Sequence, residues 1–273
     1  MKDNILSKLS KLTGHKYIEL TTRGNTAIRA ALSAIPTGSK VLIPEEGGWI
    51  SYKTLPAELG LDVVEVRCRE AKINLQDLQE KVSTKQFSAL LYQNPGGYFA
   101  EQEMKQIYQI CQLLGCLVIL DVSGSIGTEL GNGKYADFLV CSFGKWKLVE
   151  AQGGGFISAN KASLWGSLAE IKLLADEISL VKINQKIDEL PERIAFLQQI
   201  RDSLISDLEQ KSFEVVHPED NGFVVVVKYH DETEKAELVE YCQVNELEYT
   251  LCPRYIRLNE PAISIEIKRL QKS

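Results

Sequence analysis

The sequence predicts an α/β protein in which a mostly parallel sheet is sandwiched by helices, followed by a small C-terminal α+β module. Two observations support this fold class. Short, apolar, β-branched segments alternate with segments of helical periodicity over residues 26–158, which is the pattern of strand–helix–strand units. Beyond residue 211 the segments shorten and follow the order strand, strand, helix, strand, as expected for a separate small module.

In the first part, strands are expected where a short apolar segment ends at turn-forming or polar residues. These segments are 40–43, 62–66, 89–92, 116–120, 138–141 and 154–158. Helices are expected where apolar residues recur every three or four positions. They are 26–34, 51–59, 75–82 and 103–114, and most of them separate two strands.

The second part begins with a long helical stretch over residues 163–211, which Pro191 interrupts. The small module then contains strands at 214–216, 222–228 and 249–251, a helix at 235–245, and a final strand or helix at 264–268. We therefore expect a large domain over residues 1–165, a helical crossover over 166–211 and a small α+β domain over 212–273.

Composition narrows the class of protein. Of the 273 residues, 44% are hydrophobic and 25% are charged, as in soluble globular proteins. The net charge of −6 argues against nucleic acid as a partner. Apolar segments stay well short of the roughly 20 residues that a membrane span needs. The amphipathic start lacks the apolar region of a signal peptide, so we expect a cytoplasmic protein without membrane partners.

The cysteines and histidines do not suggest a metal site. The six cysteines form no C-x-x-C pair, and the three histidines are scattered along the chain. Cys116 and Cys141 lie within apolar segments, which favours buried, reduced thiols over metal ligands or disulfides.

A carboxylate and a lysine follow two neighbouring predicted strands. Asp121 ends the segment 116–120, and Lys147 lies between a Ser-Phe pair and a glycine run. Open α/β sheets bind their ligands at such strand ends. Pyridoxal 5'-phosphate (PLP) requires both groups, because a carboxylate keeps its pyridine nitrogen protonated and a lysine holds its aldehyde as a Schiff base. The pair therefore predicts a PLP site.

Other segments offer groups for the rest of such a cofactor. Gly24, Asn25 and Thr26 open a helix, where free N–H groups and a hydroxyl form a phosphate cradle, although an ordinary turn and helix cap has the same composition. Ser142 adds a hydroxyl from the end of a strand. Trp49 follows two glycines after another strand and suits stacking on a planar ring; packing of a buried tryptophan against the next helix is the equal alternative.

Two of the roles have competing candidates. Asn94 or Gln93 follows the strand 89–92 and can bond the phenolic oxygen of PLP, although Asn-Pro-Gly-Gly is also a common turn. Lys145 lies three residues after Ser142 and is the alternative to Lys147 for the Schiff base.

Arg254 and Arg257 of the small module are candidates for binding a substrate carboxylate. A guanidinium offers the planar, two-bond geometry that a carboxylate accepts. Exposed arginines on a strand are the ordinary alternative.

Taken in order, these segments resemble fold-type-I PLP enzymes, and most closely the DegT/StrS-type sugar aminotransferases. The resemblance covers roughly residues 10–160. It rests on residues 24–28, on Pro44 and the loop to Trp49, on Asp121, and on residues 142–158, where Lys147 lies five residues after Ser142 and seven before the Gly-Gly pair at 154. That group usually has Gln or His three residues after the aspartate, a position held here by Gly124.

The resemblance implies the fold-type-I large domain and an aminotransferase that acts on an amino donor and a keto sugar or keto acid. Lys147 would form the Schiff base and serve as acid and base. Asp121 would hold the pyridine nitrogen, and a homodimer would complete the site.

Three other functions stay open at this point. Lyases, desulfurases and decarboxylases share the same scaffold. A non-catalytic binding or regulatory relative is favoured by Gly124 and by a chain shorter than is typical of the group, whereas Lys147 and Asp121 argue against it. An unrelated doubly wound nucleotide-binding protein requires a Gly-rich strand-to-helix loop, which Gly24-Asn25-Thr26 matches poorly.

Overall fold

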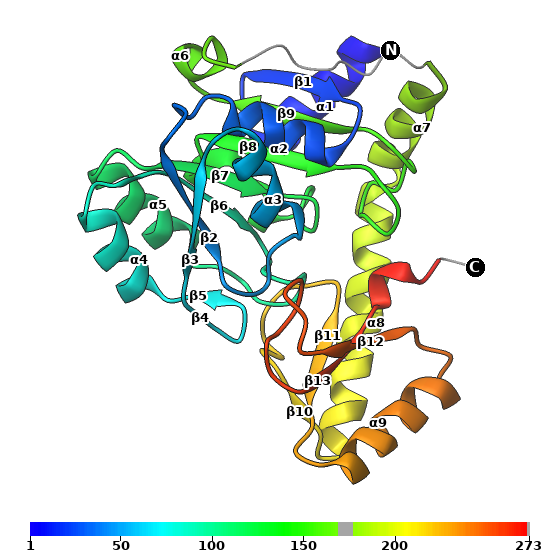
Figure 1. The fold of residues 1–273 in the computed structure, drawn as a ribbon. Helices are drawn as coiled ribbons and strands as arrows, with labels where there is room; N and C mark the ends of the chain where they lie inside the picture. Colours follow the sequence, from blue (N-terminus) through cyan, green and yellow to red (C-terminus); the bar gives the residue numbers. More distant parts are fainter. Residues whose placement is uncertain (169–176, 272–273) are drawn as a thin grey trace.

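The computed structural model describes residues 1–168 and 177–271 and contains two principal sheets (Figure 1). The large sheet has seven strands in the order β1-β9-β8-β7-β6-β2-β3, and the small sheet has four in the order β10-β11-β13-β12. The strands of the large sheet are β1 (Tyr17–Thr21), β2 (Lys40–Pro44), β3 (Asp62–Val66), β6 (Phe87–Gln93), β7 (Leu117–Asp121), β8 (Phe138–Ser142) and β9 (Gly155–Ala159).

Five neighbouring strands of the large sheet run parallel. They are β3, β2, β6, β7 and β8, while β9 pairs antiparallel with both β8 and β1. In the parallel register Asp121 lies opposite Val140, so β7 and β8 end close to each other. The predicted mostly parallel sheet is therefore confirmed.

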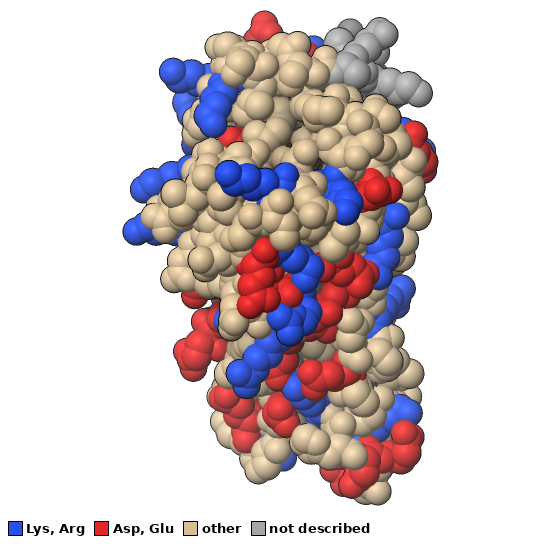
Figure 2. Space-filling model, turned by 60° about the vertical axis from the view of Figure 1, so that its left-hand side comes forward, with Lys and Arg blue, Asp and Glu red and all other residues tan. Residues whose placement is uncertain are grey.

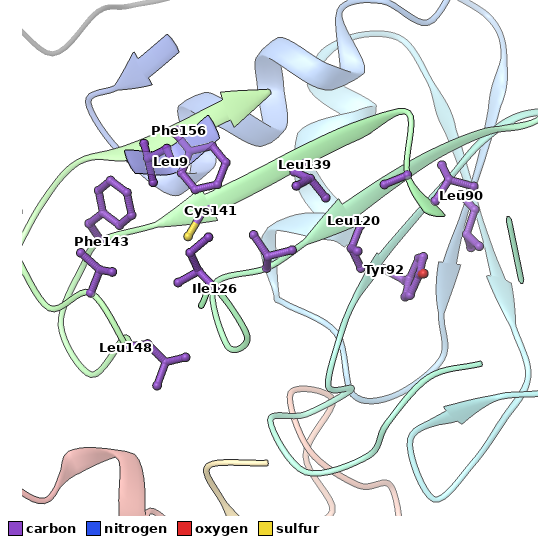
Figure 3. Packing of buried hydrophobic residues seen from close by; sticks show 14 of the residues in the cluster. Leu9, Leu90, Tyr92, Leu120, Ile126, Leu139, Cys141, Phe143, Leu148 and Phe156 are labelled. Atoms are coloured by element: carbon purple, nitrogen blue, oxygen red, sulfur yellow. The ribbon is translucent and has the colours of Figure 1, made fainter. Parts of the chain in front are cut away.

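Helices cover both faces of this sheet, because successive strand residues point to opposite sides. On one face the strands pack against α2 (Gly24–Leu32) and α3 (Ser51–Glu58). On the other face they pack against the remaining helices of this layer: α1 (Lys2–Thr13), α4 (Leu75–Ser83), α5 (Met104–Leu113), α7 (Glu177–Asp188) and the start of α8 (Leu190–Gln210). Figure 3 shows part of this second core, including Leu9, Leu139 and Phe156.

The small unit packs on the far half of α8. It contains β10 (Glu214–Val215), β11 (Val225–Lys228), β12 (Tyr249–Cys252), β13 (Ala262–Ile265) and α9 (Glu232–Val244). Leu204 and Leu208 of α8 join Leu238 and Cys242 of α9 in its core. In Figure 1, α8 runs from the large sheet down to this unit, which confirms the predicted C-terminal module.

Several elements differ from the sequence prediction. The edge strand β1 and the hairpin of β4 (Cys68–Arg69) and β5 (Lys72–Ile73) were not predicted. Only the last two residues of β1 are buried, so the strand does not need the apolar run by which the other strands were predicted. Within the predicted helical stretch there is α6 (Ala162–Trp165), residues 169–176 lie outside the described part, and Pro191 lies in the first turn of α8.

The surface and the thiols agree with the composition. Acidic and basic side chains lie interspersed over the lower half of the face in Figure 2. Five of the six cysteines are buried, all six are free thiols, and Cys68 is half-buried. In the described part of the chain, no helix has the length and apolar character needed to cross a membrane.

Candidate active site

A cavity of about 310 Å³ lies where β7 and β8 end, beside the start of α2. Small-molecule sites in proteins begin at about this size. Seven candidate residues named from the sequence line it: Gly24, Asn25, Trp49, Gln93, Asp121, Ser142 and Lys147. Residues far apart in the sequence therefore meet at one edge of the sheet, because parallel strands bring their carboxyl ends together.

Asp121 is the carboxylate of the cavity, and its geometry is fixed from two sides. Its Oδ2 accepts a hydrogen bond of 2.8 Å from the hydroxyl of Tyr52, and its Oδ1 accepts one of 2.9 Å from the N–H of Ser123. Burial, and then the charge of Asp121, raise the pKa of Tyr52 well above its usual value. The phenol therefore stays protonated and remains a donor to the carboxylate.

Close packing joins the start of α2 to the end of β8. A Cβ on Gly24 would lie 2.6 Å from the Cβ of Ser142, so only glycine allows this approach. The Oγ of Ser142 accepts a hydrogen bond of 3.2 Å from the N–H of Gly144. The first N–H groups of a helix have no partner within the helix, and those of α2 lie here beside a serine hydroxyl. This end of the cavity therefore suits an anion.

Lys147 lies between two aromatic side chains. Its Nζ is 5.0 Å from the ring centre of Trp49 and 4.8 Å from that of Tyr98, and it donates a hydrogen bond to the Tyr98 hydroxyl. Trp49 in turn donates from Nε1 to the Asn25 amide oxygen at 3.3 Å. The amine is thereby held inside the cavity.

Lys145 takes a different direction. The residue between the two lysines, Trp146, has a φ of 63°, which turns the backbone by way of the left-handed region. Lys145 is exposed and its Nζ lies 4.3 Å from the ring centre of Trp146, whereas Lys147 lines the cavity.

Two predicted cofactor residues do not line the cavity. The hydroxyl of Thr26 lies 3.0 Å from that of Thr22. The amide of Asn94 is buried in the following loop, where its oxygen accepts a 3.0 Å hydrogen bond from the N–H of Gln102. Gln93, the last residue of β6, lines the cavity instead.

The two arginines also lie away from the cavity lining. Arg254 is exposed, and Arg257 is 2% exposed within the small unit. The guanidinium of Arg257 donates to both carboxylate oxygens of Glu266, at 2.9 and 2.8 Å, and to the Ser264 hydroxyl at 3.0 Å. Its two-bond geometry is therefore already used by an internal carboxylate.

Sequence reasoning missed four polar residues of the cavity lining: Arg23, Tyr98, Ser123 and Gln152. Ser123 follows Asp121 by two residues, and its hydroxyl accepts a 2.8 Å hydrogen bond from the N–H of Ser142. Tyr98 follows the glycine pair after β6, so its position just beyond a strand end was the available signal. Arg23 and Gln152 flank predicted residues without a distinct pattern of their own.

Comparison with known families decides the class of protein. Residues 3–175 match the model of the DegT/DnrJ/EryC1/StrS aminotransferase family. The chain belongs to this family. Residues 189–273 match a second model, the MJ1341 family C-terminal domain. A search of curated proteins gave no match.

Solved structures share the fold of this DegT-family chain at low sequence identity. 3-Amino-5-hydroxybenzoic acid synthase and Helicobacter pylori PseC, an aminotransferase of pseudoaminic acid biosynthesis, each match with a TM-score of 0.78 and 16% identity, over 97% of this chain and 85% of theirs. Serine palmitoyltransferase from S. paucimobilis matches with a TM-score of 0.73 and 14% identity, over 99% of this chain and 72% of that one. At these identities the likeness concerns the fold.

The DegT family consists of PLP-dependent transferases, so this chain is an enzyme of that class and PLP is its cofactor. The cavity fits the group chemically. It offers a buried carboxylate for a protonated ring nitrogen, an amine for an aldehyde, and a helix start with a serine hydroxyl for a phosphate.

Proposed function

We propose that this enzyme is an aminotransferase that moves an amino group between an amino donor and a keto sugar or keto acid, with PLP bound to Lys147. The observation that carries the proposal is the presence of Lys147 and Asp121 in one cavity with the start of α2. Among the described lysines, only Lys147 lines this cavity. Lys147 therefore takes precedence over Lys145.

The proposal assigns each lining residue a role. Asp121 holds a proton on the pyridine nitrogen, while Tyr52 and Ser123 fix the carboxylate in place. The N–H groups at the start of α2, together with Asn25 and Ser142, bind the phosphate, and Trp49 covers the ring. Because Thr26 and Asn94 do not line the cavity, we leave them out of this assignment, and Gln93 replaces Asn94.

When bound, PLP supplies an electron sink that stabilises negative charge on the substrate carbon. The protein then has to move a proton. The amine of Lys147 is the group in position to do so, because Tyr98 and Trp49 hold it inside the cavity. A general base in hydrogen-bond reach contributes about 10²–10⁴-fold to the rate.

The absorbance spectrum tests this assignment. We expect PLP to give the wild-type protein a band near 410–430 nm, about the range of the protonated lysine-bound cofactor, and borohydride to bleach it. Lys147→Ala is expected to abolish the band, whereas Lys145→Ala, a matched control two residues away, keeps it. Loss of the band only in Lys145→Ala would contradict the assignment.

Other chemistry on the same scaffold is the second candidate. Serine palmitoyltransferase and a cysteine desulfurase from Thermococcus onnurineus share the fold, the latter with a TM-score of 0.71 and 13% identity over 98% of this chain and 79% of that one. Single-turnover assays separate the candidates. Conversion of bound cofactor to its amine form by an amino acid supports transamination, whereas formation of alanine from cysteine, with the sulfur released as sulfide by an added thiol reductant, supports desulfuration.

We further propose that the enzyme is a cytoplasmic homodimer, as the family resemblance implies. The same proposal divides the chain into a large domain (1–165), a crossover (166–211) and a small domain (212–273). Sedimentation equilibrium is expected to give twice the mass of one chain. A single-chain mass in the PLP-loaded protein would contradict the dimer.

A further inference from the structure

Tyr98 is held in an unusual backbone conformation at the cavity. It follows Gly96 and Gly97 in the loop after β6 and has a φ of 71°. A bulky aromatic residue rarely adopts this left-handed conformation, which persists only where the surroundings hold it. The side chain is 4% exposed, yet it lines the cavity. The strain is therefore located beside the reacting groups.

Two features outside its own loop define the place of the Tyr98 ring. A Cβ on Gly124 would lie 2.7 Å from Cδ1 of the ring, so any larger residue there displaces the tyrosine. The guanidinium of Arg257 lies 5.2 Å and the Nζ of Lys268 lies 4.8 Å from the centre of the same ring. The loop after β7 provides the space, and the small unit packs two basic side chains against the ring.

The hydroxyl of the ring meets the amine of Lys147. Their hydrogen bond, together with the contacts of Nζ to the Trp49 and Tyr98 rings, restricts a side chain that otherwise has four rotatable bonds. Holding a reacting group in a fixed orientation accounts for a large part of the rate acceleration of an enzyme over the reaction in solution.

We propose that Tyr98 is a positioning residue for Lys147, and that Gly124 is required because it makes room for the Tyr98 ring. The inference rests on the proposed function of Lys147. The inference gives a structural reason for Gly124, at a position where the family usually has Gln or His. The small unit contributes by packing Arg257 and Lys268 against the same ring.

Competitive acetylation of the cofactor-free protein tests this inference. Acetic anhydride labels lysines, and mass spectrometry gives the labelling of Lys147 relative to exposed Lys145. In Tyr98→Phe the ring remains but the hydrogen bond that shields the amine is lost. We expect the relative labelling of Lys147 to rise about tenfold, as for loss of a hydrogen bond to a charged group.

Tyr92→Phe is the matched control. Tyr92 is a buried tyrosine of the neighbouring strand end, its hydroxyl has no hydrogen-bond partner among the described residues, and it points into the core of Figure 3. The same substitution there is expected to leave the labelling ratio unchanged. Equal ratios in Tyr98→Phe, Tyr92→Phe and wild type would overturn the inference.

Gly124→Ala provides an independent test if Tyr98→Phe folds poorly. It is expected to raise labelling of Lys147 in the wild-type background and to have no effect in Tyr98→Gly, where no ring is left to displace. Equal effects in both backgrounds would overturn the inference. Because acetylation is measured without PLP, it can fail separately from the borohydride experiment, which alone tests whether Lys147 binds the cofactor.

Discussion

At the scale of single residues, the sequence was enough to predict which polar residues lie at strand ends. It was not enough to predict which of their side chains point into the cavity. Asp121 and Ser142 were predictable because a parallel sheet brings the ends of β7 and β8 together. The choice between Lys147 and Lys145 depends on the left-handed turn at Trp146, which no periodicity reveals.

Three candidate residues that do not line the cavity have hydrogen-bond partners four to nine positions away in the chain. The guanidinium of Arg257 donates to the carboxylate of Glu266, and the amide oxygen of Asn94 accepts from the N–H of Gln102. Thr26 pairs with the hydroxyl of Thr22 within its own segment. A strand-end or turn position shows that a polar group is available, and only the folded packing decides what it binds.

Gly24→Ala is predicted to weaken cofactor binding. The new Cβ would lie 2.6 Å from the Cβ of Ser142, so the start of α2 has to move away from β8, at a stability cost of about 1–3 kcal/mol. We expect the affinity for PLP, measured by fluorescence titration, to fall at least about tenfold.

Gly153→Ala is the control for this change. Gly153 also lines the cavity, but a Cβ there has no atom within 4 Å. It is expected to bind PLP as the wild type does. If both variants lose affinity equally, close packing of Gly24 on Ser142 is not the cause.

At the scale of elements, the small unit encloses a charge cluster. Glu266, after β13, contacts Arg257 at 2.8 Å and Lys268 at 3.0 Å, and all three side chains are buried. Burial alone would raise the pKa of Glu266, but the charges of Arg257 and Lys268 outweigh it and bring the pKa to about 2. Burial, and then the charge of Arg257, lower the pKa of Lys268 to about 7.

The two buried cations and the half-buried Arg269, 3.7 Å away, share the carboxylate of Glu266, so replacing the carboxylate and replacing one buried cation are expected to change stability differently. Glu266→Gln leaves Arg257 and Lys268 buried without a counter-ion and is predicted to lower the free energy of unfolding by about 3–5 kcal/mol. Lys268→Met removes the excess charge and keeps the volume, and is predicted to be neutral or stabilising. Urea denaturation measures both, and a larger loss in Lys268→Met would contradict this account.

The same cluster makes stability depend on pH. The lowered pKa of Glu266 gives stability that is present above its usual value of 4.5 and is lost as pH falls towards about 2. The pKa of Lys268 is about 7 in the folded chain and 10.5 in the usual, unfolded case. Between these two pH values the unfolded chain binds more protons than the folded chain, so stability rises with pH.

We therefore expect the free energy of unfolding to increase from pH 7 to 9, by up to about 1.4 kcal/mol per pH unit from this group. The difference between wild type and Lys268→Met, measured by urea denaturation at each pH, isolates the contribution. An identical pH dependence in both proteins would show that Lys268 keeps its ordinary titration.

At the scale of the whole molecule, the alternation of strands and helices was enough to predict the large sheet with its covering helices and the small C-terminal unit. Strand β3 has the predicted bounds, and most other elements differ by one to three residues at an end. The missed strand β1 shows the limit of local patterns: it lies at the edge, is buried only at its last two residues, and is defined by its pairing with β9.

That pairing has a consequence for biosynthesis. Tyr17, near the start of the chain, lies opposite Ala159, and Thr21 lies opposite Gly155. A chain emerging from the ribosome thus cannot complete this edge of its large sheet until residues 155–159 have been made. Such long-range strand pairing is slow to form, and the waiting segment leads directly into α2, which carries one wall of the cavity. Pulse proteolysis of stalled nascent chains should find the first strand accessible until β9 has left the exit tunnel, and early protection would show that it first docks elsewhere.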